Sequence, residues 1–117
     1  MNLLVNLGER IKKLRKAAGL TQTVLAETLD LSVNYIGAIE RGKRSPSLKT
    51  LQKIAAALDV TLAELFYFKK EEYKLKKEQL IESLTREMRK KEAEDLFVLS
   101  EVAKVIFGEK RRKRGLS

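Results

Sequence analysis

The corner at residues 30–32 constrains the fold more than any other feature of the sequence. Before it, Leu25, Ala26 and Leu29 have the spacing of one helix face. At its end, Ser32 is a residue type that caps helix N-termini, and a second short helical run follows. Two short helices joined by so tight a corner form a helix-turn-helix, so this corner sets the expected architecture.

Helical spacing and capping residues continue on both sides of this corner. Leu7, Ile11, Leu14 and Ala18 form one apolar stripe, and Gly19 follows as a left-handed C-cap. No stretch alternates as a strand would, so an all-α chain is predicted. The first 68 residues should hold five short helices, at about 3–18, 22–29, 33–41, 48–58 and 62–67, the last begun by a Thr61–Glu64 capping box.

The composition limits what chemistry the chain can perform. It has 117 residues with no Cys and no His, which excludes Cys/His zinc sites, thiol nucleophiles and imidazole bases. No apolar run approaches the roughly 18 residues of a membrane span, and no signal peptide is recognised. We expect a cytoplasmic protein with no enzyme activity, metal or cofactor. The formal charge of +9 suits a polyanionic partner, either nucleic acid or an acidic membrane surface.

Residues 33–41 carry an unusual face for a solvated helix. At about 100° per residue, Ile36, Ile39 and Glu40 fall on one side, which we expect to face the core. The opposite side lacks the Lys and Glu of an ordinary solvated face, and it includes a glycine that costs about 1 kcal/mol relative to Ala in a helix. That outward set is Val33, Asn34, Gly37, Ala38 and Arg41.

Such a bare face fits the major groove of DNA, which is about 12 Å wide and admits one helix. Asn34 can pair bidentately with adenine, and the methyl groups of Val33 and Ala38 can touch the thymine methyl. Gly37 would let the helix backbone approach the DNA closely. The alternative is a poorly decorated helix that faces only solvent.

Four motifs occur in order: LRKAAGLTQ at 14–22, LA at 25–26, YIGAIERGKRSPSLKTL at 35–51 and IAAALDV at 54–60. With these motifs, residues 7–66 resemble the lambda-repressor-like helix-turn-helix family, also called the Xre or Cro/phage-repressor family. The resemblance covers about half of the chain. It implies a five-helix DNA-binding domain over residues 1–68.

The resemblance also implies roles for the residues at matching positions. Gln22 would touch a DNA phosphate and steady the reading helix 32–41, and Thr23 beside it would meet phosphate or base. Arg15 and Glu40 would form a partly buried ion pair that ties the first helix to the reading helix. The base-reading positions would be Val33, Asn34 and Ala38, and the positions that meet the DNA backbone would be Arg41, Gly42, Lys43 and Arg44.

Two positions depart from the family pattern. Asp30 stands at a corner that usually holds Gly, and Asp tolerates the left-handed conformation at a cost of roughly 1 kcal/mol. Thr23 and Val24 stand where Glu often follows Gln, and Val24 removes a capping-box partner for Thr21. We therefore expect a turn that survives but is less relaxed.

The resemblance implies a sequence-specific, double-stranded DNA-binding transcriptional regulator, acting as a homodimeric repressor associated with the nucleoid. The short, uncharged reading residues favour A·T-rich half-sites and leave much of the affinity to phosphates. A second hypothesis is an antitoxin-like or regulatory module whose C-terminal helices bind a different protein, such as an antagonist. A third is RNA or nucleoid binding without sequence preference. No membrane partner is expected.

The composition changes at about residue 69, where densely charged sequence begins. Residues 96–107 are apolar on most of their circumference, so they indicate an interface. Members of the resembled family usually dimerise, and we expect residues 69–107 to be the dimerisation device. They are predicted as two helices, about 70–92 and 95–107, packed as a hairpin against a partner's pair, with one long helix as the alternative. The predicted interface residues are Leu80, Leu84, Met88, Leu96, Leu99, Val102, Ile106 and Phe107.

Two questions remain open for the C-terminal half. The apolar face can instead pack on the first and fifth helices of its own domain. The basic tail, residues 108–117 with KRRKR at 110–114, is expected to be a disordered, solvated end or a source of extra phosphate contacts.

Overall fold

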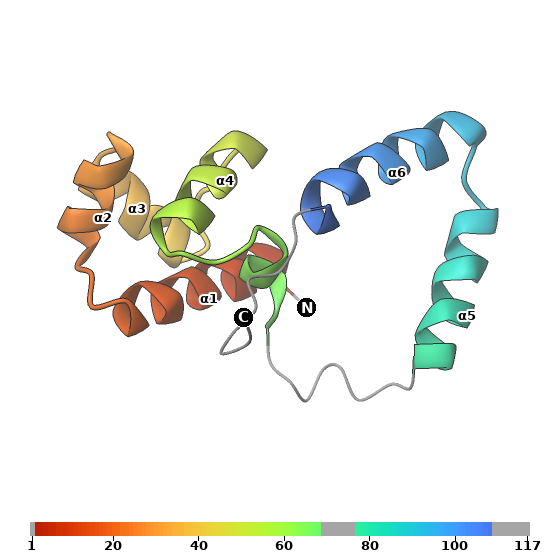
Figure 1. The fold of residues 1–117 in the computed structure, drawn as a ribbon, viewed down its shortest axis with the longest axis horizontal. Helices are drawn as coiled ribbons and strands as arrows, with labels where there is room; N and C mark the ends of the chain where they lie inside the picture. Colours follow the sequence, from red (N-terminus) through yellow and green to blue (C-terminus); the bar gives the residue numbers. More distant parts are fainter. Residues whose placement is uncertain (1, 69–76, 109–117) are drawn as a thin grey trace, which may run out of the picture. The chain divides into compact units, whose positions relative to one another are not determined.

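The computed structural model describes residues 2–68 and 77–108, and every regular element in this part of the chain is a helix (Figure 1). The predicted all-α fold is therefore confirmed. The chain divides into two compact units, Met1–Phe68 and Lys69–Ser117, which are described separately. The KRRKR segment lies outside the described residues, as does the predicted helix start at 70.

The first unit holds four α-helices and one shorter helix. The fifth short helix, expected at about 62–67, is present at Ala63–Phe66 and is a 3₁₀ helix. Its backbone bonds join residues i and i+3, as in Leu65 N–H to Leu62 O at 3.1 Å, and Tyr67 leaves the helical conformation before the helix can lengthen. The bounds are α1 Leu3–Ala17, α2 Gln22–Leu29, α3 Val33–Glu40, α4 Leu48–Ala57 and η1 Ala63–Phe66.

Side-chain caps fix where these helices begin. Each α-helix starts after a short polar side chain that accepts a backbone N–H bond at 3.0 or 3.1 Å, which satisfies a donor the helix leaves unpaired. The predicted capping box is also present: Thr61 N–H donates to Glu64 Oε1 at 3.0 Å, and Glu64 N–H donates to Thr61 Oγ1 at 3.2 Å. The caps of α1 to α4 are Asn2, Thr21, Ser32 and Ser47.

The corner between α2 and α3 has the geometry expected from the sequence. Asp30 is in the left-handed conformation, with φ 55°. The Leu31 N–H donates to Ala26 O at 2.9 Å and closes the end of α2. After three connecting residues α3 begins and packs against α2 (Figure 1).

The core of the first unit lies where α1, α2, α3, α4 and η1 meet. Ala18 was expected on the α1 stripe, but it is the exposed C-cap of that helix. Arg15 is buried instead, because a carboxylate on α3 pairs with its charge. The largest fully buried side chains are Ile11, Leu25, Ile36, Ile39, Ile54, Leu62 and Leu65.

The second unit holds α5 (Lys77–Arg89) and α6 (Ala93–Phe107). The chain forms two helices here rather than one long helix, because Glu92 is extended (φ −74°, ψ 160°) and breaks the helical path. The predicted hairpin is wrong in one respect: α5 and α6 meet at a corner and do not pack along their lengths (Figure 1). Each described helix of the chain is too short or too polar to cross a membrane.

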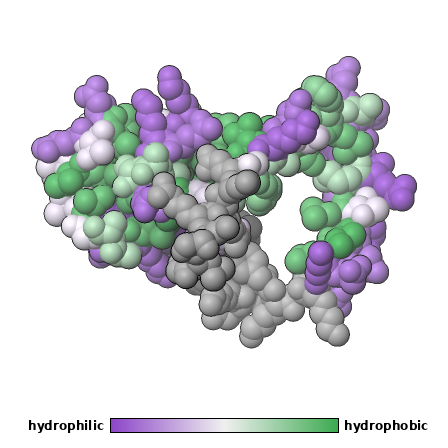
Figure 2. All heavy atoms as spheres, viewed as in Figure 1, coloured by the Kyte–Doolittle hydropathy of each residue, from purple (hydrophilic) through white to green (hydrophobic). Residues whose placement is uncertain are grey.

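Apolar side chains on both helices of the second unit are exposed to solvent, as Figure 2 shows in part. Among the predicted interface residues, Phe107 is 68% exposed and Leu84 is 60% exposed. Met88 and Ile106 are half-buried, and the remaining predicted residues are exposed. α5 and α6 therefore cover little of each other's apolar surface.

Gly8 lets α1 approach the end of α3 more closely than a larger residue would allow. A Cβ atom at this position would collide with the carbonyl oxygen of Ile39 and lie 2.6 Å from that of Glu40. Both obstacles are backbone atoms, which cannot rotate away as a side chain can. Nothing in the sequence marks Gly8, because its neighbours come from a helix about thirty residues later.

Gly8→Ala should therefore destabilise the first unit by about 1–3 kcal/mol, although Ala normally favours a helix by about 1 kcal/mol over Gly. Urea unfolding followed by circular dichroism measures the change. Lys12→Ala, at an exposed position of the same helix, is the control and should stay within about 0.5 kcal/mol of the wild type. Equal stability of Gly8→Ala and the wild type would contradict the close approach.

Candidate nucleic-acid interface

The outward face of α3 carries short side chains over a packed base. Asn34 and Arg41 are exposed, Val33 is 40% exposed and Ala38 is half-buried. The three residues expected on the inner side of this helix are all buried. The helix can therefore present its outer face to a partner without losing contacts to the core.

Gly37 departs from the expectation that its backbone lies bare. It is buried, because two longer side chains lie over it. A Cβ atom at Gly37 would be 2.9 Å from Arg41 Nη1 and 3.7 Å from Gln22 Oε1. The absence of a side chain at Gly37 makes room for side chains of the same protein, and a close approach of DNA to this backbone would require them to move.

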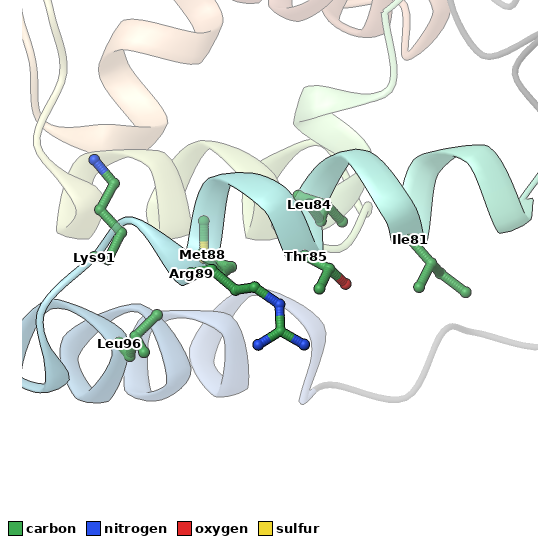
Figure 3. Close-up of a pocket in the computed structure, with 7 residues that line it drawn as sticks. All are labelled: Ile81, Leu84, Thr85, Met88, Arg89, Lys91 and Leu96. Atoms are coloured by element: carbon green, nitrogen blue, oxygen red, sulfur yellow. The ribbon is translucent and has the colours of Figure 1, made fainter.

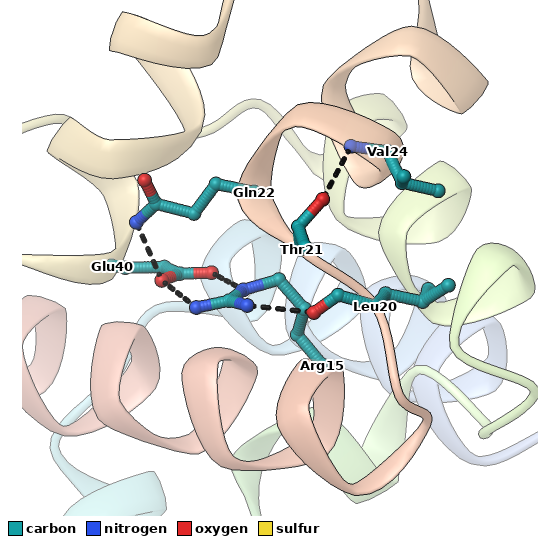
Figure 4. Close-up of polar contacts among 6 residues, drawn as sticks. All are labelled: Arg15, Leu20, Thr21, Gln22, Val24 and Glu40. Carbon is teal, nitrogen blue, oxygen red and sulfur yellow. Dashed lines mark hydrogen bonds and ion pairs between the residues drawn. The ribbon is translucent and has the colours of Figure 1, made fainter.

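Arg15 lies at the centre of a polar network beneath α3 (Figure 4). Its Nε and Nη2 donate to Glu40 Oε2 and Oε1 at 2.6 and 3.0 Å. Its Nη1 donates to Leu20 O at 2.7 Å, and Gln22 Nε2 donates to Glu40 Oε1 at 3.0 Å. The side chains of Arg15 and Glu40 are only 8% and 2% exposed.

This network joins three elements to the reading helix. It links α1, the loop after it and the start of α2 to the last residue of α3. The expected pairing of Arg15 with Glu40 is present and is buried, so its desolvation cost must be offset by good geometry. Within residues 2–68 and 77–108, no buried side-chain nitrogen or oxygen lacks a hydrogen-bond partner, which meets that requirement.

Basic side chains follow α3 at the surface. Arg41, Lys43 and Arg44 are all exposed. Gly42 lies among them with φ +73°, and a Cβ there would be 2.8 Å from Val5 Cα. Only glycine fits this turn, because it supplies the left-handed conformation and leaves room for α1.

Tyr35 is a residue of this surface that the sequence did not reveal. The Arg44 guanidinium lies over its ring, 5.4 Å from the centroid, which is a cation–π contact. The pairing depends on the reversal of the chain at Gly42. Since no helical spacing rule pairs residues nine positions apart, sequence periodicity gave no signal for it.

The start of α2 flanks the same helix. Thr23 is exposed and Gln22 is half-buried, with its amide held by Glu40. The Thr21 hydroxyl accepts the Val24 N–H at 3.1 Å, but Val24 has no side-chain acceptor to return a bond. The capping box is therefore absent at this helix start, as the sequence predicted. Val24 stands at the position of the capping-box partner and is 43% exposed.

Comparison with known proteins places this geometry in a wider group. The sequence matches the family profile described as helix-turn-helix over residues 11–65, a range that includes α2, α3 and the Arg15–Glu40 pair. The control protein C.MunI of Mycoplasma sp is 44% identical over 66 residues, which cover 56% of this chain and 89% of that relative.

Two further relatives extend the comparison. The immunity repressor protein of Bacillus phage phi105 is 39% identical over 92 residues, covering 74% of this chain and 64% of the repressor. This match is longer than the first unit and so reaches into the second. The crystal structure of the restriction-modification controller protein C.AhdI from Aeromonas hydrophila superposes with a TM-score of 0.53 at 46% identity, covering 54% of this chain and 96% of that one.

Glu40→Leu alone should destabilise the first unit by about 3–5 kcal/mol, because it leaves the Arg15 charge buried without its partner. Replacing both residues, Arg15→Met together with Glu40→Leu, should recover most of that loss. Urea unfolding of the single and double variants measures both effects. A loss below about 1 kcal/mol in the single variant is typical of a surface pair and would contradict the energetic role of burial.

Proposed function

Because the chain belongs to the helix-turn-helix family of DNA-binding transcriptional regulators, we propose that it is a homodimeric repressor that reads a palindromic operator in double-stranded DNA. One observation carries the proposal: α3 is held from below by the Arg15–Glu40 pair while Val33 and Asn34 face outward. A fixed helix with short outward side chains can lie in the major groove. Members of this family are regulators rather than enzymes.

The outward residues of α3 would read a small number of bases. Asn34 would pair with adenine through its amide, and Val33 and Ala38 would contact thymine methyl groups. These contacts favour A·T-rich half-sites. Since few side chains reach base edges, contacts to phosphates would supply much of the affinity and make it depend on salt.

Polar and basic residues around α3 would hold the DNA backbone. Gln22 and Thr23 lie at the start of α2, and Lys43 and Arg44 lie beyond the end of α3, all with exposed or half-exposed side chains. The Tyr35 ring orients the Arg44 guanidinium before DNA arrives. Contacts on both sides of a helix fix its register along the duplex.

The exposed apolar surface of α5 and α6 supports dimerisation through the second unit. The inner side of their corner forms a hollow of about 540 Å³ (Figure 3). Large contiguous apolar patches are rare on monomers and are stabilised by burial against a partner. Two copies would place their reading helices on half-sites about 34 Å apart. The hollow is lined by Ile81, Leu84, Thr85, Met88, Arg89, Lys91 and Leu96.

Occupation of promoter DNA by such a dimer would repress transcription, in the cytoplasm at the nucleoid. A second candidate function rests on the same exposed helices. An antitoxin-like or regulatory protein would use α5 and α6 to bind a different protein, and a protein antagonist of the repressor could dock there as well. The self-association of the isolated chain separates these two functions.

Asn34→Ala should lose about 1–3 kcal/mol of discrimination at one base position in each half-site. The full chain would first select its operator from a random duplex pool, and Kd would then be measured for single-base variants of that operator. Lys43→Ala is the comparison: it should weaken all duplexes alike and lower the salt slope by about one. Equal affinity of the wild type for the operator and random duplex would contradict sequence-specific reading.

Leu84→Glu should convert the full-length dimer to a monomer in sedimentation equilibrium, because a carboxylate would have to be buried in the apolar interface. Its helix content should not change, since Leu84 is already 60% exposed within one chain. Ser83→Glu, at the adjacent exposed position, is the matched control and should remain dimeric. A monomeric wild type would exclude the homodimer and favour a different protein partner.

A further inference from the structure

Two donor side chains from different helices lie over the same glycine of α3. A Cβ atom at Gly37 would be 2.9 Å from Arg41 Nη1, and it would lie 3.7 Å from Oε1 and 3.8 Å from Nε2 of the Gln22 amide. Gln22 is the first residue of α2, and Arg41 is the C-cap of α3. Gly37 therefore brings together nitrogen donors that the sequence keeps nineteen residues apart.

Both donors have capacity for a further acceptor. Gln22 Nε2 carries two hydrogens and gives one to Glu40 Oε1 at 3.0 Å. The Arg41 guanidinium makes no hydrogen bond or ion pair with any residue in the part of the chain that the structure describes. An uncommitted guanidinium beside a free amide N–H is a favourable setting for an anion.

The nearest carboxylate does not oppose an anion at this position. Glu40 is engaged by the Arg15 guanidinium through two bonds of 2.6 and 3.0 Å. The same carboxylate orients the Gln22 amide by accepting its other hydrogen. The charge of Glu40 is thus balanced from below, and the Arg41 charge above it is left unbalanced.

We propose that Gly37 is a positioning residue that creates a joint phosphate site, in which Arg41 and Gln22 bind one phosphate of the DNA backbone together. This inference rests on the proposed DNA-binding function and goes beyond separate contacts by the two side chains. It also gives Gly37 a role different from close approach of the backbone to a base. The absence of a side chain at Gly37 leaves room for the Arg41 guanidinium near the Gln22 amide.

A phosphate fits this pair of donors better than a base edge does. A base edge needs planar, bidentate hydrogen bonding from one side chain that projects into the groove. Here the guanidinium is folded back on its own helix and meets an amide that comes from α2. A phosphate oxygen accepts hydrogen bonds from several directions, so it can take donors that converge from two helices.

The proposal predicts an unusual result for Gly37→Ala. Alanine is the better helix former, and the only atom it would crowd closer than 3 Å is the end of a flexible side chain, Arg41 Nη1. The variant should therefore be at least as stable as the wild type in urea, but it should bind DNA about tenfold more weakly. Gln52→Ala, at an exposed position of α4, is the control and should bind DNA as the wild type does.

The deciding experiment uses the full chain and a set of duplexes in which single phosphates are replaced by neutral methylphosphonates. At one phosphate in each half-site, replacement by methylphosphonate should weaken binding by the wild type. The same replacement should not weaken binding by Arg41→Ala, which has already lost the contact. Gln22→Ala and Gly37→Ala should lose sensitivity at that same phosphate. Combining Gly37→Ala with Arg41→Ala should add less than twofold to the effect of Arg41→Ala alone.

Other outcomes would overturn the proposal in distinguishable ways. If Arg41→Ala and Gln22→Ala affect different phosphates, or if Gly37→Ala binds like the wild type, the joint site is excluded while the proposed regulator function stands. If Arg41→Ala changes the preferred base at one operator position, Arg41 reads a base instead. If the wild type binds no duplex, the proposed function and the joint site fail together.

Discussion

The buried ion pair between Arg15 and Glu40 is the interaction on which the candidate DNA-binding surface depends. It ties the last turn of α1 to the last residue of α3, and through Glu40 it also orients the Gln22 amide. A buried pair of this kind adds little net stability compared with apolar residues, but losing one partner is costly. The pair therefore acts less as a source of stability than as a constraint that holds one arrangement of α1, α2 and α3. The outward side chains of α3 depend on that arrangement.

The two units differ in how far their apolar side chains are buried. The first unit buries its large aliphatic side chains completely among short capped helices. The second unit leaves Phe97, Leu99 and Phe107 between 48% and 68% exposed, because two helices that meet at a corner cannot cover each other. The proposed homodimer would make use of this contrast. One helix contacts only a few base pairs, and a second copy joined through the exposed helices would let the pair read a longer site.

Gly8, Gly37 and Gly42 each leave room for atoms that a side chain at the same position would crowd. Gly8 admits the backbone carbonyls at the end of α3, and Gly42 admits Val5 of α1. Gly37 differs, because it admits the flexible end of a side chain rather than backbone. The first two determine where α3 lies, and the third determines where its nearest guanidinium lies. The sequence drew attention to Gly37 and Gly42 but not to Gly8, and at all three positions only the folded structure shows which atoms the glycine admits.

The sequence by itself determined the local features: the caps at Thr21, Ser32 and Ser47, the left-handed turn at Asp30, and the helical bounds of the first unit to within one residue. These follow from interactions between residues about four positions apart, which periodicity and capping rules describe. The resemblance added the Arg15–Glu40 pairing. Only the tertiary structure decided that Gly37 is covered, that Tyr35 lies under Arg44, that residues 63–66 form a 3₁₀ helix and that α5 and α6 stay open. Most of these outcomes depend on contacts between residues that are far apart in the sequence. Periodicity and capping rules describe only neighbouring residues, so they do not predict such contacts.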